Sequence, residues 1–233
     1  MRSAATRVPT AAVFFDVDFT LIHPGPAFQA SGYKDFCARH GIDVDPEAFD
    51  AAVAGAGSLL DTGSGEYNAQ LYIDYTRRII EGMGGSGPAV DAAAREIYRE
   101  WAACHHFTLY DDVPEVLREL HGRGLKIGLI SNSHRCMESF QSHFALEGLF
   151  AAAVTSSVHG FMKPHPSIFE TALRQAATSA AESVMVGDSV AHDVEGARRL
   201  GMRAVLVSRG FVPSTCPPEV PVIRSLRELP ALL

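Results

Sequence analysis

Five short apolar runs, separated by helical patterns, constrain the fold of this chain more than any other feature. They cover residues 11–16, 125–131, 152–156, 183–187 and 203–208. An unbroken apolar run of this length is typical of a strand that is buried on both faces. Because such runs alternate with amphipathic helices, we predict an α/β fold with a parallel sheet and helices on both of its faces.

Three stripes of apolar residues with helical spacing support the alternation. They are Val113, Val116, Leu117 and Leu120; Ile168, Ala172, Leu173 and Ala176; and Val190, Val194, Ala197 and Leu200. The pairs Asp112 with Glu115 and Ser167 with Glu170 have the spacing of capping boxes. Gly201 suits the position just after a helix. A short last helix is predicted near residues 225–233, after a proline-rich loop.

One long interval, from about residue 22 to about residue 107, contains no convincing strand. A crossover between parallel strands needs only about a dozen residues, so this interval is an insert. Its apolar residues follow a helical period, and glycine-rich pieces at residues 55–65 and 82–87 interrupt it. We therefore predict a small α-helical cap at residues 23–107 on a core of residues 1–22 and 108–233. The linkers would lie near residues 23–26 and 104–109.

Composition excludes several classes of protein. The net charge of −7 argues against a nucleic-acid partner, which usually meets a basic patch. No apolar run is long enough to span a membrane, and the run before Asp16 is too short for a signal peptide. The four cysteines form no close pair, which favours free thiols over a disulfide framework or a zinc site. We expect a cytoplasmic monomer or homodimer.

Polar residues follow four of the predicted strands. Asp16 and Asp18 end the first, Ser131 and Asn132 end the second, Lys163 comes after the third, and Asp188 follows the fourth, with Asp193 five residues later. Ligands of open parallel sheets bind outside the carboxyl ends of the strands. A helix that starts after Asn132 would add free N–H groups suited to an anion.

These strand ends predict a metal and a phosphate. Two like charges ~4 Å apart repel by roughly 4 kcal/mol at an effective dielectric of 20, so a cluster of aspartates needs cations. A hard divalent cation, most simply Mg²⁺, fits an all-oxygen site. With Lys163 it would bind a dianionic phosphate. One carboxylate could then attack phosphorus, while a second protonates the leaving alkoxide and later activates water.

In this order, the four motifs resemble those of the haloacid dehalogenase (HAD) superfamily, and the insert lies where that superfamily carries its helical C1 cap. The segments around Lys163, Asp188 and Asp193 are similar to phosphoglycolate phosphatase-like enzymes and other small-metabolite phosphatases. The resemblance implies a Rossmann-like core of five strands and a mobile cap. It also implies that Asp16 is the nucleophile and Asp18 the general acid/base.

The remaining roles are also carried over by resemblance. Ser131, Asn132 and Lys163 would hold the phosphate, with Lys163 also stabilising the transferring group. Mg²⁺ would be bound by the Asp16 carboxylate, the Asp18 carbonyl and Asp188, with Asp193 as a ligand or just behind the ligands. The resemblance thus predicts an Mg²⁺-dependent phosphatase of a small phosphorylated metabolite.

Several alternatives stay open. The superfamily commonly has glycine at the position of Phe19, which puts the local loop geometry in question. Dehalogenating members usually lack the second aspartate, so Asp18 favours phosphate chemistry. A phosphomutase, a 2-haloacid dehalogenase or a non-catalytic binding protein of the same fold are the rival hypotheses.

Other polar and aromatic residues have plainer interpretations. Asp193 could be an ordinary solvated helix residue, and His165 and His192 are interpreted as loop or surface residues. His134 and Arg135 follow Ser131 and Asn132 closely and could contact the substrate. In the insert, Tyr67, Tyr72, Tyr75 and Trp101 are interpreted as its small core. The substrate itself has no readable code, although residues 55–66 are a candidate for specificity.

Overall fold

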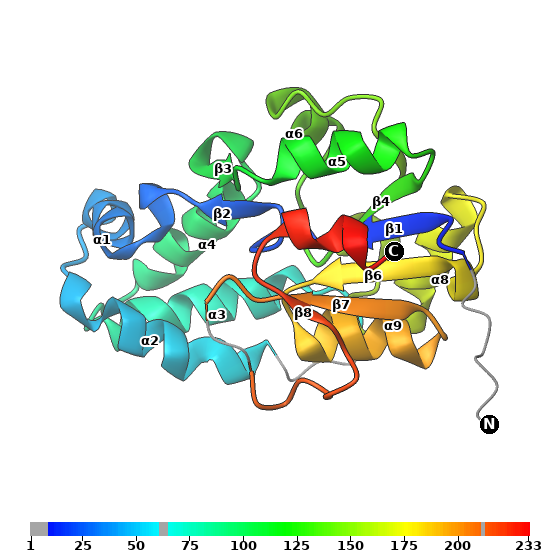
Figure 1. The fold of residues 1–233 in the computed structure, drawn as a ribbon. Coiled ribbons are helices and arrows are strands. Elements are labelled where there is room, and N and C mark those ends of the chain that lie inside the picture. Colours follow the sequence, from blue (N-terminus) through cyan, green and yellow to red (C-terminus); the bar gives the residue numbers. More distant parts are fainter. Residues whose placement is uncertain (1–8, 61–64, 211–212) are drawn as a thin grey trace.

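The computed structural model describes residues 9–60, 65–210 and 213–233 (Figure 1). Its main element is a six-stranded sheet with the order β5-β4-β1-β6-β7-β8. The strands are β1 (Ala12–Phe15), β4 (Lys126–Ser131), β5 (Phe150–Thr155), β6 (Ser183–Gly187), β7 (Arg203–Val207) and β8 (Val222–Ile223). Every neighbouring pair is parallel. The predicted parallel sheet is confirmed, and β8 is an additional strand at its edge.

The central strand β1 shows why these apolar runs become strands buried on both faces. All four of its residues are fully buried. Val13 and Phe15 belong to a core shared with helices α5 (Val113–Gly122) and α6 (Met137–His143). Ala12 and Phe14 belong to a second core, shared with α8 (Pro166–Gln175) and α9 (Glu195–Arg199). Alternate residues thus point to opposite helical layers. Figure 1 shows α5 and α6 on one side of the sheet and α9 on the other.

Two of the predicted helix starts differ in detail. Asp112 precedes α5, but its side chain makes no capping bond, so the capping box predicted there is wrong. The side chain is instead buried, and accepts hydrogen bonds from Arg209, Ser225 and the backbone of Leu226. These bonds attach the C-terminal segment to the core.

The second predicted capping box is also wrong. Helix α8 begins at Pro166 and its N-cap is His165, so Ser167 already lies inside the helix. His165 accepts the hydrogen bond from the backbone N–H of Ser167 in place of a serine hydroxyl. A different box is present at Ser225 and Glu228, where the predicted last helix forms as a 3-10 helix, Leu226–Ala231. Gly201 has φ +79°, as expected for its position after a helix.

The insert is helical, as predicted. It contains α1 (Ala30–Arg39), α2 (Phe49–Ala56), α3 (Ala69–Gly82) and α4 (Val90–Glu100), and Figure 1 shows these helices on one side of the sheet. Two short strands, β2 (Ile22–Pro24) and β3 (Phe107–Leu109), connect it to the core and pair antiparallel. These strands occupy the predicted linkers. We call the helical insert the cap; a short helix, α7 (Ser156–His159), follows β5 in the core.

Part of the first glycine-rich piece, residues 61–64, lies outside the described residues. In the part of the chain that is described, no helix combines the length and the apolar character needed to cross a membrane.

Candidate active site

Asp16 directly follows β1, at the carboxyl edge of the sheet. Its backbone N–H donates to the carbonyl of Val186 at 2.9 Å, which continues the pairing of β1 with β6 beyond the strand. Asp18 lies on the turn that follows. Two backbone bonds to the carbonyl of Val17, from Leu21 and Ile22, hold this turn. The sheet therefore places both aspartates at its carboxyl edge, as the sequence predicts.

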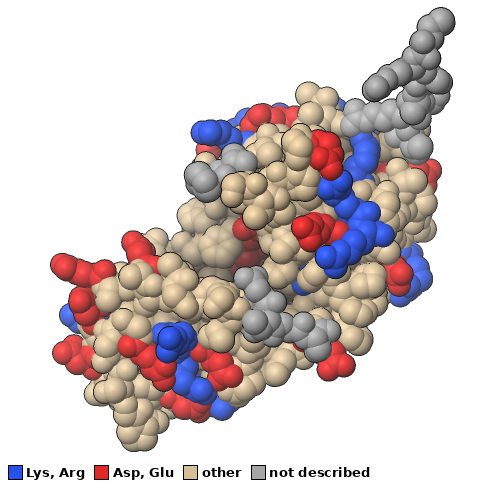
Figure 2. Space-filling view, turned by 90° about the horizontal axis from the view of Figure 1, so that it is seen from below, with Lys and Arg blue, Asp and Glu red and all other residues tan. Residues whose placement is uncertain are grey.

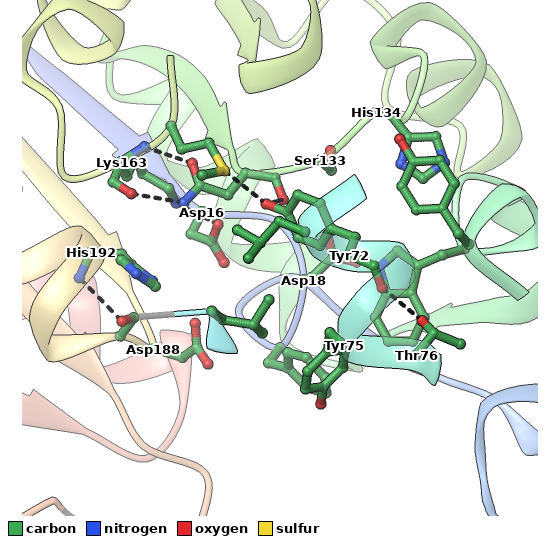
Figure 3. A pocket seen from close by; sticks show the side chains of 18 of the residues that line it. Asp16, Asp18, Tyr72, Tyr75, Thr76, Ser133, His134, Lys163, Asp188 and His192 are labelled. Atoms are coloured by element: carbon green, nitrogen blue, oxygen red, sulfur yellow. Dashed lines mark hydrogen bonds and ion pairs between the residues drawn. The ribbon is translucent and has the colours of Figure 1, made fainter. Parts of the chain in front are cut away.

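Lys163 connects two of the candidate aspartates. Its Nζ donates to Oδ1 of Asp16 and to Oδ1 of Asp193, each at 2.6 Å, and the lysine is 3% exposed (Figure 3). A buried ammonium held between two carboxylates loses its hydration, but gains two charge-assisted hydrogen bonds. The interpretation of Asp193 as a solvated residue is therefore wrong, since Asp193 is 1% exposed and ion-paired.

Asn132 fixes the position of Lys163. Its amide donates to the backbone carbonyl of Lys163 at 2.9 Å and accepts from the backbone N–H of Lys163 at 2.7 Å. The side chain thus attaches the loop that carries the lysine to the end of β4. Neighbouring Ser131 is 1% exposed, and its hydroxyl donates to Ser133 Oγ at 2.9 Å.

The turn after β6 brings Asp188 and Asp193 into the same place. Oδ2 of Asp193 accepts from the backbone N–H of Ser189 at 3.0 Å. The chain then follows a π-helical turn, Val190–Val194, before α9. A Cβ added to Gly187 would lie 2.2 Å from the carboxylate of Asp193. Glycine is therefore required where the carboxylate packs against the strand end.

The electrostatics of the cluster disfavour its full ionisation. Burial is the main cause that raises the pKa of Asp16 to about 7, and the charges of Asp193 and Asp18 add to it, while Lys163 opposes the rise. Burial and the charges of Asp16 and Asp193 also raise the pKa of Asp188 to about 8. The single positive charge of Lys163 does not balance the negative charges that Asp16, Asp188 and Asp193 would carry if all three were ionised.

These residues fit a hard divalent cation. Asp16, Asp188 and Asp193 each offer a carboxylate oxygen, and these oxygens lie within 4.8 Å of one another. An all-oxygen set matches the preference of Mg²⁺. The raised pKa values of Asp16 and Asp188 agree with this, because a bound cation would favour the ionised form of both carboxylates.

The structure shows a partner of Asp18 that the sequence did not reveal. Arg135 donates from a guanidinium nitrogen to Oδ1 of Asp18 at 2.8 Å, and the arginine is 1% exposed. Its guanidinium lies over the ring of Phe107 in β3, 4.2 Å from the centroid, and also donates to the carbonyl of Ala102. Arg135 therefore holds the Asp18 carboxylate and contacts the linker between core and cap. Its place four residues after Ser131 gave no signal of this role.

The strand ends open into a cavity of ≈ 390 Å³ between the core and the cap. Asp16, Asp18, Lys163, Asp188 and Asp193 line it from the core. In Figure 2 a hollow lies between the two parts of the molecule, with acidic surface at its base. The cavity therefore places the polar strand ends in contact with space for a small ligand.

On the cap side, aromatic and aliphatic side chains line the cavity. Tyr72 and Tyr75 of α3 and Trp101 after α4 are among them. Tyr75 and Trp101 also pack against the hydrophobic core, as predicted, but the prediction did not include their second place in the cavity lining. Tyr67 does not line the cavity; its hydroxyl is hydrogen-bonded to that of Tyr98. Amphipathic periodicity identifies one face of a helix, but does not distinguish a packed core from a cavity wall.

Three further residues complete the lining. His134 lines the cavity and stacks on Tyr98, with ring centroids 4.1 Å apart. His192 also lines it, so its interpretation as a surface residue is wrong. Phe19 has φ +64° and is 46% exposed, with its ring 6.4 Å from that of Trp101. A left-handed residue explains why glycine suits this position; here phenylalanine adds an aromatic side chain to the cavity.

Comparison with known proteins identifies the family. The sequence matches haloacid dehalogenase-like hydrolases over residues 10–201. This chain belongs to that family. The match spans the cap and all four polar strand ends, and it confirms the resemblance drawn from the motifs.

Individual relatives include phosphatases and a dehalogenase. The chain is 29% identical to human haloacid dehalogenase-like hydrolase domain-containing protein 3, covering 87% of this chain and 84% of that one. It is also 29% identical to the ribulose-1,5-bisphosphate 5-phosphatase of Halopiger xanaduensis, covering 84% and 83%. The crystal structure of a 2-haloacid dehalogenase from Pseudomonas syringae has a TM-score of 0.64 and 25% identity, with 96% and 97% covered. The family and the phosphatase relatives support hydrolase activity of the phosphatase type.

Proposed function

We propose that this hydrolase is an Mg²⁺-dependent phosphatase that cleaves a small phosphorylated metabolite through a phospho-aspartate on Asp16. The observation that carries the proposal is the arrangement of Asp16, Lys163 and Asp193 in one ion-paired group, with Asp188 close by, at the base of a ligand-sized cavity. A buried lysine beside a carboxylate nucleophile suits a dianionic phosphoryl group.

The chain's own residues support a two-step reaction. In the first step an oxygen of Asp16 attacks phosphorus, the bond from phosphorus to the ester oxygen breaks, and Asp18 gives a proton to the leaving oxygen. In the second step Asp18 takes a proton from water, whose oxygen attacks the phosphorus on Asp16 and releases inorganic phosphate. Arg135 holds the Asp18 carboxylate in place for both transfers. Lys163, fixed by Asn132, would neutralise charge on the transferring group.

The metal contributes charge at the same place. Asp16, Asp188 and Asp193, with the backbone carbonyl of Asp18, would hold Mg²⁺, which when bound would polarise a phosphoryl oxygen as a Lewis acid. Ser131 and Asn132 at the end of β4 would bind the phosphate from the opposite side. The cap would exclude water from the cavity and select the organic group of the substrate.

A 2-haloacid dehalogenase is the second candidate, because a solved enzyme of that name is 25% identical to this chain. In that reaction a carboxylate displaces halide from carbon and forms an ester, which water then hydrolyses. No leaving alkoxide has to be protonated, so an acid at the position of Asp18 has no evident task. Asp18, held by Arg135 at 2.8 Å, therefore favours phosphate chemistry.

The test is phosphate release from a panel of phosphorylated metabolites, with Mg²⁺ and with EDTA. We expect Mg²⁺-dependent release that Asp16→Asn abolishes. Asp43→Asn, which removes the same charge from an exposed position, should keep wild-type turnover. Wild-type turnover in purified Asp16→Asn would contradict the proposal. Halide release from a haloacid without Mg²⁺ would favour the dehalogenase, and an isomerised phosphosugar with little free phosphate would indicate a mutase.

A further inference from the structure

Among the described residues, those that line the cavity from the helices of the cap carry uncharged rings and aliphatic side chains, apart from the hydroxyl of Thr76. Along α3, α4 and the residue after α4 the cap presents Leu71, Tyr72, Tyr75, Ile97, Tyr98 and Trp101. We call these six residues the cap wall. Figure 3 shows Tyr72 near Asp16 and Asp18, with Tyr75 farther from Asp16. This wall lies opposite the strand ends, where the organic part of a phosphate ester would have to lie.

Two polar groups of the cap wall, the hydroxyls of Tyr72 and Tyr98, have hydrogen-bond partners within the protein. The Tyr72 hydroxyl donates to the carbonyl of Asn132 at 3.3 Å and contacts the sulfur of Met162 at 3.2 Å. The Tyr98 hydroxyl is hydrogen-bonded to that of Tyr67. Thr76, which also lines the cavity, donates to the carbonyl of Tyr72 at 2.9 Å. The wall therefore offers mainly ring faces to a ligand, with the Tyr75 hydroxyl and the Trp101 indole N–H as its other polar groups.

Positive charge in the cavity is confined to the phosphate end. Among the described lining residues, Lys163 is the one lysine or arginine, and it is already paired with Asp16 and Asp193. Of the two histidines that line the cavity, His134 has a pKa lowered by burial and by neighbouring Arg135. Figure 3 shows His192 beside Asp188, at the other end of the site from His134. A second anionic group on the substrate would meet no cation at the cap wall.

We infer that the substrate is a phosphate monoester of a small, uncharged and mainly apolar alcohol. The inference rests on the proposed phosphatase function and specifies its substrate class. Burying a carboxylate or second phosphate against these rings would leave a charge without a partner, which is costly. An apolar ring would instead bury area against the wall and stack on it. The cavity of ≈ 390 Å³ lies within the range of small-molecule pockets and has room for such an organic group beside the phosphate.

A binding experiment tests the inference independently of turnover. Trp101 is the single tryptophan of the chain and lies in the cap wall, so its fluorescence reports on a ligand there. We would titrate the Mg²⁺-loaded protein with benzylphosphonate, phosphonoacetate and methylphosphonate, which cannot be hydrolysed at the carbon–phosphorus bond. Benzylphosphonate should bind at least about tenfold more tightly than phosphonoacetate. Equal or tighter binding of phosphonoacetate would overturn the inference.

A substitution in the cap wall should reverse the preference. Leu71→Arg places a cation on the wall, and should shift the ratio of the two affinities toward phosphonoacetate by about tenfold or more. Val158→Arg adds the same charge at a position that is 89% exposed and outside the cavity lining, so it should leave the ratio unchanged. Circular dichroism verifies that both variants are folded. A ratio unchanged by Leu71→Arg in a folded protein would contradict the assignment of the wall.

Parallel hydrolysis of benzyl phosphate, ethyl phosphate and 2-phosphoglycolate separates the two proposals. Phosphate release that is fastest from benzyl phosphate supports both. Release that is fastest from 2-phosphoglycolate would leave the phosphatase intact and overturn the substrate class. Absence of release from all three, combined with tight benzylphosphonate binding, would contradict the phosphatase while the cavity retained the predicted preference.

Discussion

Replacing Asp188 by Asn should make the metal-free protein more stable at alkaline pH, although it would remove a proposed metal ligand. Burial, with the charges of Asp16 and Asp193, raises the pKa of Asp188 from 3.8 to about 8. Between these pH values the folded protein keeps a proton that the unfolded chain has released. Because the folded state then binds more protons than the unfolded state, the free energy of unfolding falls as the pH rises through this window.

The magnitude follows from the same two pKa values. At about 1.4 kcal/mol per unit of pKa, the gap from 3.8 to about 8 sets a ceiling of ~6 kcal/mol on the cost of the Asp188 charge above pH 8. Solvent and the coupled titration of Asp16 reduce this cost, so we expect Asp188→Asn to raise the free energy of unfolding by about 2–4 kcal/mol. Below pH 4 the side chain at position 188 is uncharged in both proteins, and the difference in the free energy of unfolding should approach zero.

Urea unfolding in EDTA at a series of pH values measures the effect. Asp43→Asn is the matched control, since the same change at an exposed position should alter the free energy of unfolding by less than about 0.5 kcal/mol. Added Mg²⁺ should stabilise wild type more as the pH rises, because protons compete with the metal for the carboxylates. It should stabilise Asp188→Asn much less. An Asp188→Asn protein that is less stable than wild type in EDTA above pH 8 would refute the electrostatic account.

Three other substitutions test the supporting structure. Arg135→Met leaves the Asp18 carboxylate without its buried partner, so the free energy of unfolding, measured by thermal or urea unfolding, should fall by about 3–5 kcal/mol. A double-mutant cycle with Asp18→Asn should show coupling between the two residues, and additive losses would contradict the ion pair. Gly187→Ala should lower kcat by at least about tenfold in steady-state assays, because the Cβ of the new alanine would displace the Asp193 carboxylate. An unchanged kcat would contradict the close packing of Asp193 against this position. Asp112→Ala should lower the free energy of unfolding by about 3 kcal/mol while KM stays constant, since Asp112 anchors the C-terminal segment away from the cavity.

The sequence was most informative where burial on both faces enforces an unbroken apolar run. Strands β1, β4, β6 and β7 coincide with such runs to within a residue or two, and β5 starts two residues before its predicted run. Strand β8 was not predicted, because Val222 and Ile223 follow a proline-rich loop and are too short to show a pattern. Its pairing with β7 depends on the tertiary position of the C-terminal segment.

Capping was predicted less well, because the sequence shows spacing but not the competing partners. Asp112 has the spacing of a cap, yet Arg209 and Ser225, about a hundred residues away, take its oxygens. Its burial opposes ionisation, but hydrogen bonds from these two residues and the charge of Arg209 lower the pKa of Asp112. Such a buried ion pair is set by the fold as a whole and has no local signature.

Some residues of the candidate site could be predicted from the sequence, and others could not. Asp16, Asp18, Lys163, Asp188 and Asp193 were found because they follow buried strands, and parallel strands bring their carboxyl ends together. The cap wall was missed because a tyrosine that faces a cavity has the same helical period as one that packs in a core. The sequence therefore predicts which residues meet at the strand ends better than which cap residues line the cavity.

The most direct test of the proposed mechanism is to identify the group that forms on Asp16 during turnover. Wild type is mixed with a substrate and Mg²⁺ in ¹⁸O-labelled water, quenched in acid, and its peptides and the released phosphate are examined by mass spectrometry. We predict a phosphoryl group on the Asp16 peptide, with the label in inorganic phosphate and none retained in Asp16. Label incorporated into the Asp16 carboxylate would show water attacking an ester carbon, as in a dehalogenase, and would contradict the account.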